Sequence, residues 1–401
     1  MQSIAERHEE PTAIRTNLGA IFVSLELSRS IWLITSVSPG GGEKMSKRSV
    51  SAGDIAALLT RFSELGKKAF AQTGKSFPII VIQEAGLDGF WLDRALEDEG
   101  IESYVVDPAS IAAPRRLRRA KTDRIDGEAL LRTLMAYLRG EPRVCSMVRA
   151  PTPEEEDNRR LCRERNTLIV ERVRHVNRIK GLLFSQGVGD YEPLARDRRQ
   201  RLEALQTGDG RLLPAHLKAQ IARELDRLEL LMAQIKAVEK ERDAWLAAPA
   251  ERAAEPTPTP QARATDAHGP AMLMRLNGIG PEFTAVVWSE GLSRDFANRR
   301  QVAAYAGLAP TPWRSGSIEN EQGVSKSGNR RLRATMIELA WMWLRHQPDS
   351  ALTLWFKERA KRGDKRTRKT MIVALARKLL VALWKYVNAG VVIQGAVFKH
   401  D

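Results

Sequence analysis

Cysteine, uninterrupted apolar runs and negative charge are all in short supply in this chain of 401 residues. Two cysteines, Cys145 and Cys162, cannot build a disulfide framework or hold a structural zinc ion by themselves, which fits a reducing compartment. No uncharged apolar run reaches the roughly 18 residues of a membrane helix, because Glu338 and Arg377 interrupt two apolar stretches. The first ten residues lack the apolar core of a signal peptide. We therefore expect a cytoplasmic protein with no membrane partner.

Acidic residues are outnumbered by basic ones. The chain has 64 Lys and Arg against 49 Asp and Glu, a formal net charge of +15. An excess of this size points to a polyanionic partner, because neutralising phosphates releases counterions. Nucleic acid is the leading candidate.

The first part of the chain predicts an α/β domain over residues 18–150, after an N-terminal tail over 1–17. Two β-branched runs within 18–37 suggest a hairpin, and the continuous apolar run PIIVIQE from Pro78 predicts a buried strand. Further strands are expected near 45–51 and in IESYVVD, with helices over 55–65, over 88–99, and from Thr122 or Asp123 through Leu138. This order is that of a ribonuclease H-like (RuvC-like) domain.

The rest of the chain predicts mainly helical structure, so the expected fold class is multidomain, α/β plus all-α. Residues 151–246 have helical periodicity, and an apolar stripe that includes Ile221, Leu225 and Leu228 predicts a coiled-coil seam. A helical hairpin within one chain fits the stripe equally well. Residues 247–270 are rich in Pro, Ala and Thr and predict a linker. A second globular unit is expected over 271–389, followed by a tail over 390–401.

Four acidic residues of the first domain are candidates for a metal site. Glu26 ends the first predicted strand, Glu84 ends a central one, and Asp123 and Asp126 are three apart at a helix start. Carboxylates that converge repel one another, and Mg²⁺ relieves this because it prefers oxygen ligands. Two ions about 4 Å apart can serve phosphodiester chemistry. The alternative is that each acid is a helix cap or a solvated strand end.

A basic run immediately precedes Asp123 and could bring phosphates to the metals or form a solvated loop: Arg115, Arg116, Arg118, Arg119 and Lys121.

A glycine-containing turn and two basic stretches stand out in the C-terminal part of the chain. The turn with Gly278 and Gly280 resembles a helix-hairpin-helix, whose glycines let backbone N–H groups approach a phosphate. The stretch 305–333 predicts one loop and a helix start that carry Ser315 and the polar residues Arg314, Lys326, Asn329, Arg330 and Arg331. The stretch 357–370 predicts a nucleic-acid backbone track with Lys365, Arg366, Arg368 and Lys369. Ser315 has no nucleophile-elbow motif or histidine pattern around it, so its activation would need metal or arginine.

These motifs together resemble the IS-one-ten (IS110) family of insertion-sequence transposases, relatives of the Piv-type DNA invertases. The resemblance rests on six motifs in order: VSLELSRSIWLI, VIQEAGLDGFWLDRAL, RRAKTDRIDGEALL, LNGIGPEFTAVVWSE, QVAAYAGLAPTPWRSGS and GVSKSGNRRLR. It implies a RuvC-like DEDD metal site on Glu26, Glu84, Asp123 and Asp126, a coiled coil, and a serine nucleophile at Ser315. Glu26 stands where the family usually has Asp.

The resemblance also implies partners. They are donor and target DNA, a structured guide (bridge) RNA, and further copies of the chain in a homodimer or homotetramer with composite sites. It implies a bacterial protein that acts at the nucleoid. Two other functions remain open from the residues alone: a metal-dependent Holliday-junction-type nuclease that uses water, and a nucleic-acid scaffold without catalysis. Covalent attachment of DNA to protein separates the first two.

Overall fold

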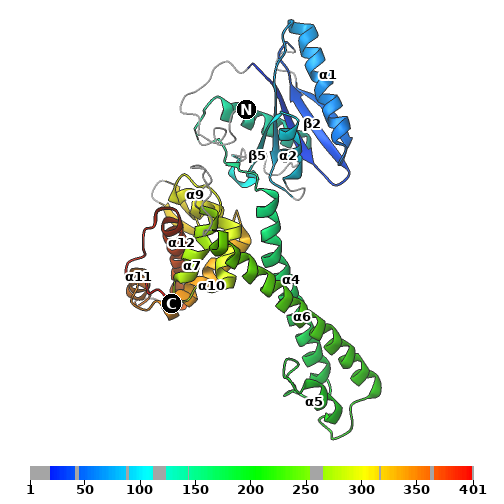
Figure 1. Ribbon diagram of the computed structural model, residues 1–401, viewed down its shortest axis with the longest axis vertical. Helices are drawn as coiled ribbons and strands as arrows, with labels where there is room; N and C mark the ends of the chain where they lie inside the picture. Colours follow the sequence, from blue (N-terminus) through cyan, green and yellow to red (C-terminus); the bar gives the residue numbers. More distant parts are fainter. Residues whose placement is uncertain are drawn as a thin grey trace. The chain divides into compact units, whose positions relative to one another are not determined.

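The computed structural model describes residues 19–40, 45–86, 90–111, 123–142, 144–252, 265–315, 318–361 and 365–399. The chain divides into two compact units, Met1–Thr152 and Pro153–Asp401. Unit 1 is α/β and unit 2 is mainly helical (Figure 1), in agreement with the expected fold class. Within the described ranges, no helix combines the length and apolar composition that crossing a bilayer requires.

Unit 1 is built on a six-stranded mixed sheet of order β3-β2-β1-β4-β5-β6. Strand β1 pairs antiparallel with β2 and parallel with β4, which pairs parallel with β5. This order fits a ribonuclease H-like fold. The elements are β1 (Ile21–Leu27), β2 (Ile31–Val37), β3 (Ser46–Ser51), α1 (Ile55–Thr73), β4 (Ile79–Glu84), α2 (Trp91–Asp98), β5 (Glu102–Val106), the 3₁₀ turn η2 (Pro108–Ser110), α3 (Asp123–Leu138) and β6 (Met147–Val148).

Helices cover both faces of this sheet. Helix α1 begins at the cap Asp54, whose carboxylate accepts from the Ala57 N–H at 2.9 Å, and it buries Leu58 and Phe62 on one face together with α2. Helix α3 packs on the opposite face, where Leu130 and Leu134 meet the side chains of β1, β4 and β5. Successive strand residues alternate between these two cores.

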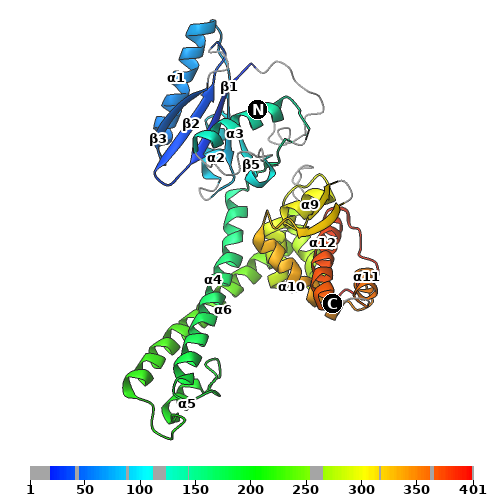
Figure 2. The same ribbon diagram turned by 180° about the vertical axis from the view of Figure 1, so that it is seen from behind.

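Unit 2 begins with two long helices that pack side by side, α4 (Pro153–Phe184) and α6 (Ala215–Arg252), joined through α5 (Arg198–Ala204) (Figures 1 and 2). The pairing is antiparallel, since Arg165 contacts Glu239 while His175 contacts Glu224. The stripe predicted as a seam is buried against α4 of the same chain: Ile221, Leu225 and Leu228 are fully buried. The described contacts are those of a helical hairpin within one chain.

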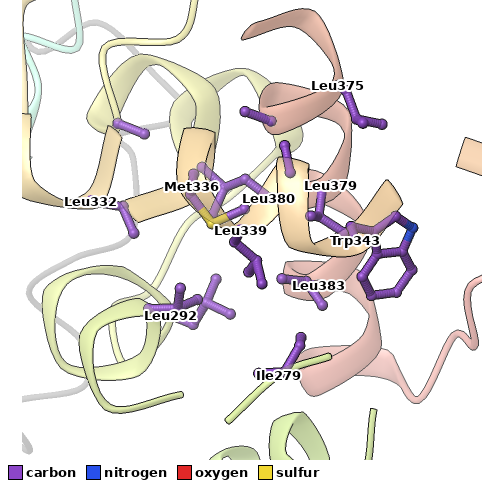
Figure 3. Packing of buried hydrophobic residues seen from close by; sticks show 14 of the residues in the cluster. Ile279, Leu292, Leu332, Met336, Leu339, Trp343, Leu375, Leu379, Leu380 and Leu383 are labelled. Carbon is purple, nitrogen blue, oxygen red and sulfur yellow. The ribbon is translucent and has the colours of Figure 1, made fainter. Parts of the chain in front are cut away.

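The remaining helices form a globular part around one large core. Leu332, Met336 and Trp343 of α10 pack against α12 (Figure 3). The elements are α7 (Thr265–Arg275), α8 (Pro281–Val287), the π-helix η4 (Trp288–Leu292), α9 (Arg299–Tyr305), β7 (Pro310–Ser315), β8 (Ile318–Val324), α10 (Arg330–His346), α11 (Ala351–Ala360) and α12 (Lys365–Ala389).

Three segments differ from the sequence expectations. The stretch 305–333 is not one loop, because 310–315 and 318–324 pair as an antiparallel hairpin. The expected linker 247–270 is helical at both described ends, since α6 continues to Arg252 and α7 begins at Thr265. The expected tail 390–399 is packed: Ile393 is 7 % exposed, and Lys399 N–H donates to the Arg275 carbonyl at 2.8 Å. Burial of the Ile393 side chain and the backbone hydrogen bond of Lys399 hold this segment against the rest of the unit.

Candidate functional site

Glu26 and Glu84 lie at the ends of neighbouring parallel strands. In the register of β1 and β4, Leu25 is opposite Gln83, and the two glutamates follow one residue later on each strand. Strand alternation puts them on the same sheet face as Ser24 and Ile82, the face that α3 covers. Both glutamates therefore lie at the same edge of the sheet, and their role as metal ligands stays a prediction.

The start of α3 is anchored on the same face. The Ser24 hydroxyl donates to the Gly127 carbonyl at 2.7 Å, and Lys47 binds Glu128 at 2.5 Å. Gly127 allows this approach, because a Cβ at that position would lie 2.6 Å from Thr35 Oγ1.

Asp123 is the first residue of α3 and Asp126 immediately precedes Gly127. The side chains of 123–126 lie outside the described structure, as does the basic run with Arg115, Arg116, Arg118, Arg119 and Lys121.

The described donors fit a hard divalent cation, although they do not complete a site by themselves. Glu26 and Glu84 offer carboxylate oxygens, which Mg²⁺ prefers. No group of three or more His, Cys, Asp or Glu side chains converges among the residues whose side chains are described. A complete site would therefore need the acids at the start of α3.

Ser315 is the last residue of β7 and pairs with Ile318 across the hairpin. Its side chain and that of Arg314 are outside the described structure. The two cysteines are poor alternative nucleophiles: burial raises the pKa of Cys145 to about 11, and burial followed by the charge of Glu282 does the same for Cys162. Both thiols are therefore protonated at neutral pH.

A buried carboxylate ties together three segments of unit 2. Glu290 lies in η4 with its side chain 2 % exposed, and Arg163 donates two hydrogen bonds to it at 2.8 and 3.0 Å. Asn329 Nδ2 donates to the same carboxylate at 2.9 Å. Burial by itself would raise the pKa of Glu290, but these hydrogen bonds outweigh it and hold the pKa below its ordinary value.

This arrangement fixes the start of α10, because Asn329 also caps that helix by accepting from the Leu332 N–H at 2.9 Å. Sequence reasoning assigned Asn329 to nucleic acid and overlooked Glu290. One signal was available: Glu290 is an acid inside the apolar run AVVWSEGL, which is typical of a buried pair.

Comparison with known proteins decides the family. A family model described as "Transposase IS116/IS110/IS902 family" matches residues 271–355, and a DEDD model of IS110, described as "Transposase", matches 40–185. The chain is 70 % identical to "Putative transposase y4rJ" of Sinorhizobium fredii over the full length of both proteins. The chain belongs to the IS110 family of transposases. It is therefore an enzyme of a class that cleaves and rejoins DNA.

More distant relatives agree with this assignment. The transposase for insertion sequence element IS1328 of Yersinia enterocolitica is 23 % identical over 85 % of this chain and 91 % of its own length. The transposase for insertion sequence element IS1111A of Coxiella burnetii is 26 % identical over 76 % of each chain.

The glycines of the predicted phosphate turn have different environments in this transposase. Gly278 has a φ of 87°, and a Cβ there would lie 2.7 Å from the His346 Cβ, so close packing against α10 explains this glycine. Gly280 precedes α8 and has open space around it.

Some of the basic residues assigned to nucleic acid make contacts within the chain. Arg331 donates to the Cys162 carbonyl, and Arg368 lies over the Trp341 ring at 5.8 Å. Lys326, Arg330 and Lys369 are exposed. The side chains of Lys365 and Arg366 lie outside the described structure.

Proposed function

We propose that this transposase cuts and rejoins DNA through a serine-phosphodiester intermediate, with Ser315 as the nucleophile and the acids of unit 1 as the metal site. The observation that supports this most directly is the common sheet edge of Glu26 and Glu84 together with the anchored start of α3. The family match to a DEDD transposase adds independent support.

The chemical step balances without a further reactant. Ser315 Oγ attacks a DNA phosphorus, and a P–O bond to serine forms as the P–O bond to the departing strand breaks. The serine proton ends on the hydroxyl of the departing strand. Because the energy of one phosphodiester is kept in the other, a new strand end can reverse the step without ATP.

Glu26, Glu84, Asp123 and Asp126 would hold Mg²⁺, with two ions in each site. When bound, Mg²⁺ lowers the pKa of an attacking hydroxyl and stabilises the charge on the leaving oxygen. Arg314, Lys326 and Arg330 are the candidates to neutralise the phosphate oxygens during attack.

The proposed partners are donor and target DNA, a structured guide RNA, and further copies of the chain in a dimer or tetramer. The net charge of +15 is compatible with binding two kinds of nucleic acid at once. The protein would act on the DNA of a bacterial nucleoid.

The experiment that tests the proposal is a search for protein-linked DNA. The full chain is incubated with Mg²⁺, co-purified RNA and end-labelled cognate DNA, then denatured and separated by size. A labelled strand that migrates with the protein supports the serine intermediate. Cleaved strands that carry no protein would support a nuclease that uses water, and binding without cleavage would support a scaffold.

A further inference from the structure

A groove of about 1190 Å³ lies in the globular part of unit 2, and the proposed function uses only Lys326 of its lining. It is lined by residues of α9, α11 and α12 and by the open end of the β7–β8 hairpin, so all its walls belong to one compact unit. We refer to it as the α12 groove. Its size exceeds that of an ordinary small-molecule pocket.

Positive charge dominates the walls of the α12 groove. Helix α12 contributes Lys369, Arg377, Lys378 and Lys385. Lys369 and Lys385 are sixteen residues apart, so these cations extend along about 24 Å of helix. That length can follow several nucleotides of a strand.

The opposite walls continue the same charge. Arg299 and Arg300 come from the start of α9, Lys326 follows β8, and Arg359 lies near the end of α11. None of the eight lining cations forms an ion pair with a carboxylate among the described residues, and no acid belongs to the described lining. Eight cations without a counter-charge attract a polyanion.

Apolar side chains also line the groove, and Leu352, Val373 and Val381 among them are partly exposed. We refer to this apolar lining as the floor. A DNA or RNA duplex presents its phosphates outward and stacks its bases inside. Its bases therefore cannot make apolar contacts with the floor of the groove. An unpaired strand has exposed base faces that gain by contact with an apolar surface. The combination of basic walls and apolar floor favours the unpaired strand.

Trp355 holds two of the cations in place. Arg359 lies over its ring at 5.2 Å and Lys378 at 4.8 Å. Cation–π contacts restrain these long side chains before a ligand binds. Less rotamer entropy is then lost when the ligand binds. We assign Trp355 a positioning role for these cations.

We propose that the α12 groove binds one unpaired nucleic-acid strand, with phosphates on its basic walls and bases on its apolar floor. This deepens the proposed function and rests on it in one respect: Pro310 and Val324 of the hairpin line the groove, and Ser315 is at the other end of that hairpin. Five strand residues span about 17 Å. A strand held in the groove is thus one hairpin length from the proposed nucleophile.

The test measures binding by the full chain, purified free of RNA, to three labelled probes of about 20 units, longer than common single-strand sites. They are oligo-dT, oligo-rU and a blunt DNA duplex. The variant K378Q/K385Q removes two groove cations, and K236Q/K240Q removes two exposed lysines of α6 as the matched control. We expect the groove variant to bind single strands about 10-fold more weakly and the duplex less than about 2-fold more weakly.

The salt dependence gives a second readout. Losing two phosphate contacts should make the slope of log K against log salt for a single strand shallower by about 1.4. A loss with oligo-rU alone would identify RNA as the strand, and a loss with oligo-dT alone would identify DNA. An equal loss for duplex and single strands, or no loss beyond that of K236Q/K240Q, would overturn the proposal.

The floor is tested separately by V373T/V381T, which keeps side-chain shape and adds two hydroxyls. We expect weaker single-strand binding with an unchanged salt slope, because no phosphate contact is lost. Unchanged binding would overturn the role of the floor. None of these assays requires cleavage, so the groove can fail while the Ser315 adduct forms, and the adduct can fail while the groove binds.

Discussion

The hydroxyl of Ser24 donates a hydrogen bond to the carbonyl of Gly127 at 2.7 Å, across 103 residues of chain. This bond joins β1, two residues before Glu26, to the start of α3, one residue after Asp126. Two of the proposed metal ligands, Glu26 and Asp126, therefore lie close in sequence to the two ends of this one hydrogen bond. Their geometry should depend on how closely α3 approaches the sheet.

Replacing Gly127 by alanine tests that dependence. The new Cβ would lie 2.6 Å from Thr35 Oγ1, so we expect a loss of about 1–3 kcal/mol in the free energy of unfolding and a marked loss of strand cleavage. Thr35 is fully buried, and its hydroxyl has no hydrogen-bond partner among the described residues.

The double variant G127A/T35A removes the opposing oxygen and should regain much of both losses. Urea denaturation and cleavage rates of the two single variants and the double variant form the cycle. Strictly additive losses would show that contact with Thr35 is not the cause.

The proposed metal site predicts that substitutions of its acids have different effects. Glu84→Gln and Glu26→Gln should abolish Mg²⁺-dependent cleavage, whereas Glu26→Asp should keep it, because aspartate still offers a carboxylate to the metal. Glu99→Gln, an exposed acid at the end of α2, is the matched control.

A readout without DNA is thermal unfolding with and without Mg²⁺. Ligand binding at about 100 times Kd stabilises by about 2.7 kcal/mol, and the gain should disappear in Glu84→Gln. Normal cleavage by that variant would remove Glu84 from the site.

Glu290 predicts a defined acid response. Its pKa in the folded protein is below the ordinary value of 4.5, so the folded state binds fewer protons there than the unfolded state. The resulting stabilisation is complete above about pH 4.5 and is lost as the pH falls through the lower folded pKa.

Glu290→Gln should cost about 1–3 kcal/mol at neutral pH and lose less stability than the wild type on acidification. Denaturant midpoints measured across this pH range check both. Parallel curves for the two proteins would contradict the depressed pKa.

Much of unit 1 could be predicted from sequence because its signals are local. The β-branched runs of β1 and β2 and the short apolar run of β4 specify strands, and the acids at their ends follow from chain order. The β7–β8 hairpin escaped prediction, since Pro310 and Pro312 argue against a strand and IENEQGV lacks an apolar alternation.

The α12 groove and the Glu290 contacts escaped for another reason. Arg300, Lys326 and Lys378 come from three separate segments of the chain, and only tertiary packing brings them to one groove. Glu290 likewise meets Arg163 across 127 residues. Sequence spacing contains no information about pairings of that kind.

Guidance by RNA predicts that the RNA, rather than the protein, chooses the site. RNase-treated protein should lose recombination at the cognate sites, and adding back the co-purified RNA should restore it. Recombination at the same sites and rate after RNase treatment, with RNA removal verified by gel, would count decisively against guidance.

The central claim is tested most directly by locating the residue that carries DNA. Protein is incubated with Mg²⁺, RNA and cognate DNA, the adduct is trimmed with nuclease, and the peptide that contains residues 313–317 is sequenced by mass spectrometry. Ser315→Ala and Ser317→Ala are compared, since the two serines are two positions apart in the sequence. We predict a nucleotide on Ser315, an adduct retained by Ser317→Ala and none with Ser315→Ala. A nucleotide on Ser317, or cleavage by Ser315→Ala at the normal rate, would contradict the account.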